Sequence, residues 1–183
     1  MADRKRRRKG KPQSSSDRSR PSIGRAAQEI RLRRLEGEGC ELVEPRCARD
    51  RADDIEEVQE MIVGGETEIA RDEIRWLLQG CHDFLEAHKL LGELAYAEHD
   101  LPLARGHFGY AFRIGQQAIA RAGDPRPVPY KLPGNRAFYE SGKALALCLI
   151  QLDKRDMAAE VVRDLVSYDP TDPLGVREIL DVH

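Results

Sequence analysis

The stretch "LLGELAYAEHDLPLARGHFGYAF", residues 90–112, contains two apolar runs joined by a polar hinge. Gly92 lies inside the first run, and Ala104 is followed four residues later by Phe108 in the second. Small side chains at positions 92 and 104 let two helix backbones approach closely, and the phenyl ring fills the space beside them. We therefore predict a pair of antiparallel helices that pack at Gly92.

The signals around this pair agree with a helical reading. Asp100 can cap the second helix, with Pro102 in its first turn, and Gly64-Gly65 ends an earlier apolar stripe. Asn135 can cap a later helix in the same way. From residue 51 onward the apolar residues recur at helical spacing almost throughout, so the sequence predicts a helical domain.

The same unit recurs along the chain. Ala70 lies 34 residues before Ala104 and is followed by Ile74 in the position of the phenylalanine. Ala158 lies 54 residues after Ala104, which equals one 34-residue period plus an insertion of 20 residues, and it is followed by Val162. The repetition predicts three similar helix pairs.

This arrangement resembles the tetratricopeptide repeat family, in which Leu-Gly in the first helix precedes Ala-x-x-x-Phe in the second. The resemblance covers roughly residues 51–172, and it departs from the family at the signature Trp position, which is Asp54, His88 and Gly142. The chain is also similar to small bacterial tetratricopeptide proteins with no assigned activity. The resemblance implies an all-α fold, a short right-handed solenoid of three helix pairs with a C-terminal capping helix.

The chain divides into three parts by composition. We expect a disordered basic tail at 1–20, a basic helix and irregular linker at 21–50, and the helical domain at 51–183. Within the domain the expected segments are repeats at about 51–84, 85–118 and 139–172, an insertion at 119–138, and a capping helix at 173–183. The insertion has four prolines between residues 122 and 135, and it either covers the groove or is a tolerated surface loop.

The resemblance implies that the first helix of each pair lines a concave groove that binds a protein or peptide. The candidate groove residues are Ile55, Gln59, Ile62, Lys89, Glu93, Tyr96, Glu140, Lys143 and Leu147. Members of the family that bind chaperone C-terminal tails use a clamp of Lys, Asn and Arg. The corresponding positions here are Ile55, Gln59, Leu90, Glu140 and Ala144, so chaperone tails are not the expected ligand.

Charge is distributed unevenly. Residues 1–34 hold thirteen Lys/Arg and three Asp/Glu, a net +10, whereas residues 35–183 hold 17 and 29, a net −12. The candidate residues for an anionic partner are Arg4, Lys5, Arg6, Arg7, Arg8, Lys9 and Lys11. RNA or the ribosome, an acidic protein, the acidic body itself, nuclear import and simple solubilisation are the open readings of this basic arm.

The four cysteines form no dense framework, and the charged beginning lacks the apolar region of a signal peptide. We therefore expect reduced thiols, no disulfide and a cytoplasmic protein without a membrane span. Cys40 and Cys47, with Cys81-His82 much later, do not match zinc-ligand spacing, so no metal or cofactor is expected. His99 and His107 flank Asp100, but Asp100 is interpreted as the helix cap and His107 as a helix-surface residue.

No phosphate loop, nucleophile elbow or metalloprotease motif occurs, so an enzyme is not expected. The leading hypothesis is a non-catalytic adaptor that binds a protein segment in its groove and an anionic partner through its arm. The alternative is a nucleic-acid- or ribosome-associated adaptor held mainly by residues 1–34. A metal-binding protein or an enzyme with an unrecognised site ranks below both.

Overall fold

The computed structural model describes residues 29–181, which are mostly helical. The helices are α1 (Arg46–Arg49), α2 (Ala52–Val63), α3 (Thr67–Gly80), α4 (Leu85–Ala97), α5 (Leu101–Arg121), α6 (Arg136–Gln151) and α7 (Arg155–Tyr168). Two 3-10 helices, η2 (Pro133–Asn135) and η3 (Val176–Leu180), and two strands, β1 (Arg31–Leu35) and β2 (Gly39–Val43), complete the fold. In this part of the chain, no helix combines the length and apolar character that crossing a membrane requires.

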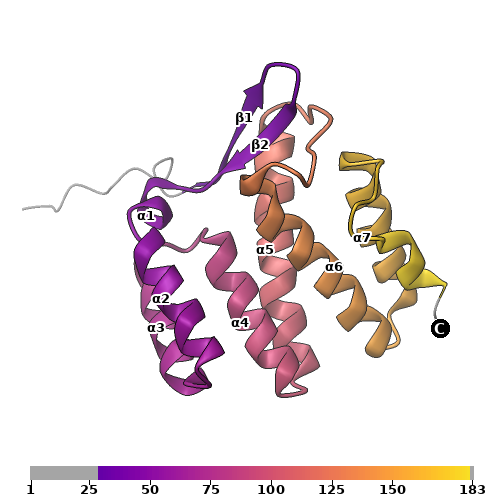
Figure 1. The fold of residues 1–183 in the computed structure, drawn as a ribbon. Coiled ribbons are helices and arrows are strands. Elements are labelled where there is room, and N and C mark those ends of the chain that lie inside the picture. Colours follow the sequence, from indigo (N-terminus) through magenta and orange to yellow (C-terminus); the bar gives the residue numbers. More distant parts are fainter. Residues whose placement is uncertain (1–28, 182–183) are drawn as a thin grey trace, which may run out of the picture.

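The larger helices form three consecutive pairs, α2 with α3, α4 with α5, and α6 with α7, which follow one another across the molecule (Figure 1). Gly64 and Gly65 directly follow the end of α2, as predicted. Asp100 caps α5, because its side chain accepts a hydrogen bond of 3.0 Å from the Leu103 backbone N–H, and Pro102 lies in the first turn. The predicted helices of the 51–172 region are thus confirmed.

Gly92 has the packing role predicted for it. A Cβ atom at this position would lie 2.5 Å from Cε1 of Phe108, whose ring is buried between α4 and α5. Ala104 is fully buried beside this contact. The two helices can pack at this distance only because position 92 carries no side chain.

The core is divided into two clusters. One is built mainly by α5, α6 and α7 and includes Phe108, Phe112 and Phe138. The other is built by α2, α3 and α4, with Ala48 of α1 packed into it. Two elements that the sequence did not predict contribute to these clusters: the β1–β2 hairpin to the first and α1 to the second.

A β-hairpin replaces the expected basic helix and irregular linker. β1 and β2 pair antiparallel, with Leu32 opposite Leu42. Gly37 in the turn and Gly39 at the start of β2 both have positive φ. Ile23 and Ala27, on which the helix prediction partly depended, lie outside the described residues, as does the tail at 1–20. The prediction was wrong for 31–43 because Leu42 and its neighbours gain their burial from contacts with distant segments.

The insertion is one of those distant segments. Helix α5 continues to Arg121, and the following loop binds the hairpin: the Cys40 N–H donates to the Pro127 carbonyl at 2.9 Å. Val128 in this loop is fully buried, and its N–H donates to the Tyr168 carbonyl at 2.9 Å. The loop is therefore part of the folded core and not a tolerated surface insertion, and only its last residues reach the cleft described below.

Asn135 is the residue that joins the insertion to the hairpin. Its side chain does not cap α6, contrary to the prediction. Instead the buried amide accepts from the Leu42 N–H at 2.8 Å and donates to the carbonyls of Cys40 (2.9 Å) and Pro129 (2.8 Å). All of these partners are backbone groups, so Asn135 completes a sheet edge that would otherwise end in unpaired polar atoms.

The chain end covers the last pair with less helix than expected. In place of a helix over 173–183, the five-residue η3 packs against α7, with Ile179 buried and Leu180 partly buried. Asp172 accepts a hydrogen bond of 2.8 Å from the Val176 N–H and so caps this short element. Residues 182 and 183 lie outside the described part.

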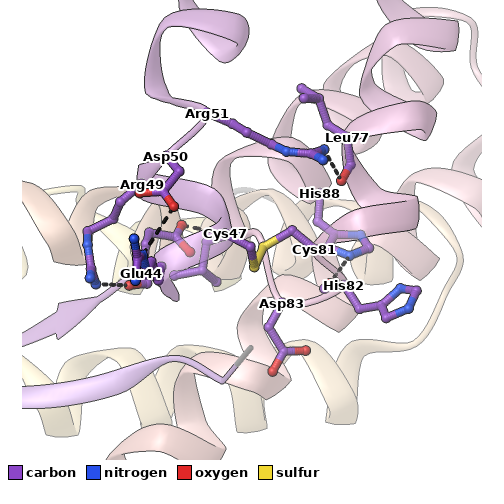
Figure 2. Close-up of a disulfide and its surroundings, with 12 residues drawn as sticks. Glu44, Cys47, Arg49, Asp50, Arg51, Leu77, Cys81, His82, Asp83 and His88 are labelled. Atoms are coloured by element: carbon purple, nitrogen blue, oxygen red, sulfur yellow. Dashed lines mark hydrogen bonds and ion pairs between the residues drawn. A yellow bond between two sulfur atoms is a disulfide. The ribbon is translucent and has the colours of Figure 1, made fainter. Parts of the chain in front are cut away.

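The expectation of reduced thiols is contradicted by a disulfide between Cys47 and Cys81 (Figure 2). The two residues are 34 apart in the sequence, and their Cα atoms are 5.6 Å apart. The prediction was wrong because it relied on cysteine density, whereas the fold places these two positions side by side before successive helix pairs. Cys40 and Cys148 are buried and unpaired.

Candidate functional site

A cleft with a volume of about 660 Å³ lies against the first helices of all three pairs. Helix α2 contributes Ala52, Ile55, Glu56 and Gln59; α4 contributes Glu86 and Lys89; and α6 contributes Arg136, Ala137 and Glu140. Its walls are completed by Glu44, Ala48, Arg49, Phe84, Pro133 and Gly134. The cleft is thus bounded by the first helix of each pair, by α1, which was not predicted, and by the end of the insertion.

The cleft combines an apolar surface with polar groups. Ile55, Phe84 and Ala48 supply buried apolar atoms. The Gln59 side-chain amide donates a hydrogen bond of 2.9 Å to Glu86 and so links α2 to α4. An apolar surface with a few fixed polar groups is the composition expected of a binding site for a chain segment or small ligand.

Lys89 lies between two carboxylates. Its ammonium group is 2.8 Å from Glu86 and 2.9 Å from Glu140, and the Tyr130 hydroxyl donates to the other Glu140 oxygen at 3.0 Å. Burial alone would lower the pKa of Lys89, but the two carboxylates outweigh it and the pKa is raised. The charge of this lysine is therefore compensated within the protein.

Glu44 is the most unusual ionisable group of the cleft. Its carboxyl group is buried, and one oxygen accepts a hydrogen bond of 3.1 Å from the Leu85 N–H at the start of α4. The other oxygen is buried and has no hydrogen-bond partner among the described residues. Burial raises the pKa of Glu44 to about 8, although the N–H groups of Leu85 and Glu86 favour the ionised form.

The structure brings four of the nine predicted groove residues into this cleft, namely Ile55, Gln59, Lys89 and Glu140. The other five, Ile62, Glu93, Tyr96, Lys143 and Leu147, do not line it. The Tyr96 hydroxyl accepts a hydrogen bond from the Gln151 side-chain amide, and the Lys143 ammonium group donates a hydrogen bond of 2.8 Å to the Leu174 carbonyl. The predicted residues for an anionic partner, Arg4 to Lys11, lie outside the described residues.

A second polar cluster lies beside the disulfide (Figure 2). Nε2 of His88 is 3.0 Å from the His82 carbonyl, and its Nδ1 is 3.4 Å from Nδ1 of His107. Since a carbonyl only accepts, Nε2 of His88 carries the proton and Nδ1 accepts from His107. The Tyr110 hydroxyl donates to Asp83 at 3.2 Å. Burial lowers the pKa of His88 to about 4, so its ring is neutral at pH 7.

His107 is half-buried against His88 of α4, so the surface role expected for it is only partly right. Within residues 29–181 no group of three or more His, Cys, Asp and Glu side chains is placed to hold a metal ion. The contacts of His88 join α4, α5 and the turn before α4. They account for the cluster as a structural connection between the helix pairs.

Sequence reasoning missed Glu44, Glu86 and the Pro133–Gly134 wall. Sequence reasoning could have found Glu86, because this residue lies three positions before Lys89 on the same helix. Glu44 and the wall carry no local signal, since their place in the cleft depends on the hairpin and the insertion. Comparisons of the chain with protein-family models, curated proteins and solved structures each found no match.

Proposed function

We propose that the chain is a non-catalytic interaction module of the tetratricopeptide repeat type, which binds a segment of a partner protein in its cleft. The observation that supports this proposal most directly is that the first helix of each pair contributes to one cleft. The recurrence of fully buried Ala70, Ala104 and Ala158 at the repeat positions supports the same family assignment. The volume and mixed lining of the cleft fit a few residues of an extended chain.

A blocking variant tests the cleft. Ala52 is exposed and lines the cleft, so Ala52→Trp fills it without disturbing the core. Ala120 is also exposed and helical but lies on α5 outside the cleft, which makes Ala120→Trp the matched control. In affinity capture from nuclease-treated lysate of the source cells, we expect Ala52→Trp to lose the proteins that Ala120→Trp retains. Equal recovery by the two variants would contradict a function of the cleft.

A second candidate function is binding of nucleic acid or the ribosome through the basic arm, which the net +10 of residues 1–34 favours. Because β1 begins at Arg31, the arm should be removed before Glu29 and not at residue 34. Recovery that is lost on deletion of residues 1–28 or on nuclease treatment, but retained by Ala52→Trp, would support this candidate over the first.

The cytoplasm remains the proposed compartment, and the Cys47–Cys81 bond makes this testable. Reducing compartments keep most protein thiols free, whereas oxidising ones retain disulfides. Alkylation of thiols in freshly acid-quenched cells, followed by mass spectrometry, reports the state of the pair. A fully oxidised pair would contradict a reducing compartment.

A further inference from the structure

Helix α2 forms one wall of the cleft, and all of its charged side chains are acidic. Its five charged side chains are Asp53, Asp54, Glu56, Glu57 and Glu60. All except Asp54 are exposed, and none takes part in the ion pairs formed within residues 29–181. This helix therefore presents uncompensated negative charge.

One of these carboxylates lines the cleft, and two more continue from it along the outer edge of α2. Glu56 lines the cleft directly. Asp53 and Glu60 precede and follow Glu56 by three and four residues, so they are its neighbours on the same face of the helix. Spacings of three and four residues give a row about 10 Å long, and long Lys or Arg side chains at three alternate positions of an extended segment, about 13 Å from first to last, can reach it.

Glu44 is an independent indication that a ligand with a polar group binds at the cleft. It lies on the cleft, and its second carboxyl oxygen is buried without a hydrogen-bond partner. An unpaired buried polar atom is costly, and a polar group of a bound segment would satisfy it. Glu86 and Asp83 nearby add negative charge around this group.

The basic residues that line the cleft, Arg49, Lys89 and Arg136, all lie outside α2. Lys89 is already paired with Glu86 and Glu140, and Arg49 donates to the Glu44 carbonyl at 2.7 Å. Arg136 also lines the cleft, on α6 and not on α2. The net −12 of residues 35–183 adds a long-range field that attracts cations.

We infer that the segment bound in the cleft is basic, with Lys or Arg side chains that pair with Asp53, Glu56 and Glu60 on α2 and a polar group that reaches Glu44. This inference rests on the proposed function of the cleft and names the chemical class of its partner. The partner is a protein segment, because the apolar surface at Ile55 and Phe84 favours side chains over a bare polyamine.

The test uses the full chain and three fluorescent 12-residue peptides that share one apolar framework and carry Lys, Gln or Glu at alternate positions. Binding is followed by fluorescence anisotropy at 50 and 300 mM NaCl. We expect the Lys peptide to bind at least about tenfold more tightly than the Glu peptide, with weaker binding at the higher salt concentration. Equal or tighter binding of the Gln or Glu peptide would overturn the inference.

Two charge-neutralising variants separate the α2 wall from diffuse attraction. Glu56→Gln/Glu60→Gln should weaken binding of the Lys peptide about fivefold, since exposed ion pairs each contribute modestly. Asp156→Asn/Glu160→Gln removes two exposed carboxylates with the same spacing on α7 and should change it less than about twofold. Equal weakening by both double variants would place the attraction on the whole body and refute the α2 wall.

The outcome remains distinct from that of the proposed function. If the Gln or Glu peptide binds as tightly as the Lys peptide and Ala52→Trp abolishes its binding, the cleft function stands and the basic partner is wrong. If Ala52→Trp leaves both peptide binding and protein capture unchanged, the cleft function itself fails.

Discussion

Gly92 and Phe108 form the contact on which the packing of α4 against α5 depends. A Cβ atom at Gly92 would lie 2.5 Å from the Phe108 ring, which has no free space to move into because it is buried. We expect Gly92→Ala to lower the free energy of unfolding by about 2 kcal/mol, measured by urea denaturation.

Gly106 provides the matched control for this prediction. It lies inside α5, is exposed, and a Cβ atom there would meet no atom within 4 Å. Gly106→Ala should raise the free energy of unfolding by about 0.5–1 kcal/mol through its effect on helix propensity and on the unfolded chain. A stabilising Gly92→Ala would show that the two helices can separate at little cost.

Glu44 should give the protein a specific dependence on pH. The pKa of Glu44 is about 8 in the folded state against an ordinary value of 4.5. Between these two pH values the folded state keeps a proton on Glu44 that the unfolded state has released. The free energy of unfolding of the native protein should therefore fall as pH rises through this window. Relative to Glu44→Gln, which stays neutral, we expect a loss on the order of 3 kcal/mol between pH 5 and pH 8.

The difference in the free energy of unfolding between the native protein and Glu44→Gln isolates the effect of Glu44, because other groups such as His88 titrate in both proteins. Urea denaturation at each pH gives the two curves. Parallel curves would mean that the Glu44 carboxyl is solvated in solution.

At the scale of elements, the hairpin and the insertion depend on each other through Asn135. Asn135→Ala would leave the Leu42 N–H and the Cys40 and Pro129 carbonyls without their buried partner. We expect a loss of about 3 kcal/mol in the free energy of unfolding. Asn135→Ser distinguishes this role from helix capping. Serine is a good capping residue, so stability would be retained if Asn135 acted as a cap. Serine is too short to reach the hairpin, so we expect Asn135→Ser to lose stability as Asn135→Ala does.

The elements also show what the sequence could predict. The long helices were predictable because their apolar period extends over many residues, and Asp100 and Gly64-Gly65 mark their boundaries locally. The hairpin strands have only five residues each, and the alternation of arginines with Leu32 and Leu35 in β1 also fits part of a helical pattern. Four of the fifteen residues that line the cleft were likewise predictable, because residues such as Gln59, Lys89 and Glu140 lie on long helices. Glu44 was not, since its burial depends on where the hairpin leaves the core.

At the scale of the whole molecule, the Cys47–Cys81 bond connects segments that precede successive helix pairs. A crosslink that closes a loop of 34 residues stabilises the folded state by about 3–4 kcal/mol, through the lower entropy of the unfolded chain. We expect Cys47→Ser/Cys81→Ser, and the native protein treated with dithiothreitol, to unfold at the same lower denaturant concentration. Dithiothreitol should not affect the double variant, because Cys40 and Cys148 are unpaired. Identical midpoints for oxidised and reduced native protein would contradict this stabilisation.

The same bond changes how the chain responds to mechanical force. When the two ends are pulled apart, tension passes through the sulfur atoms from residue 47 to residue 81 and bypasses the backbone of α2 and α3. These helices cannot then be drawn out while the disulfide is intact. Reduction would release a hidden length of roughly 110 Å of chain. The first helix pair is therefore inextensible while the bond is intact, and the reduced protein becomes a longer and more compliant spring.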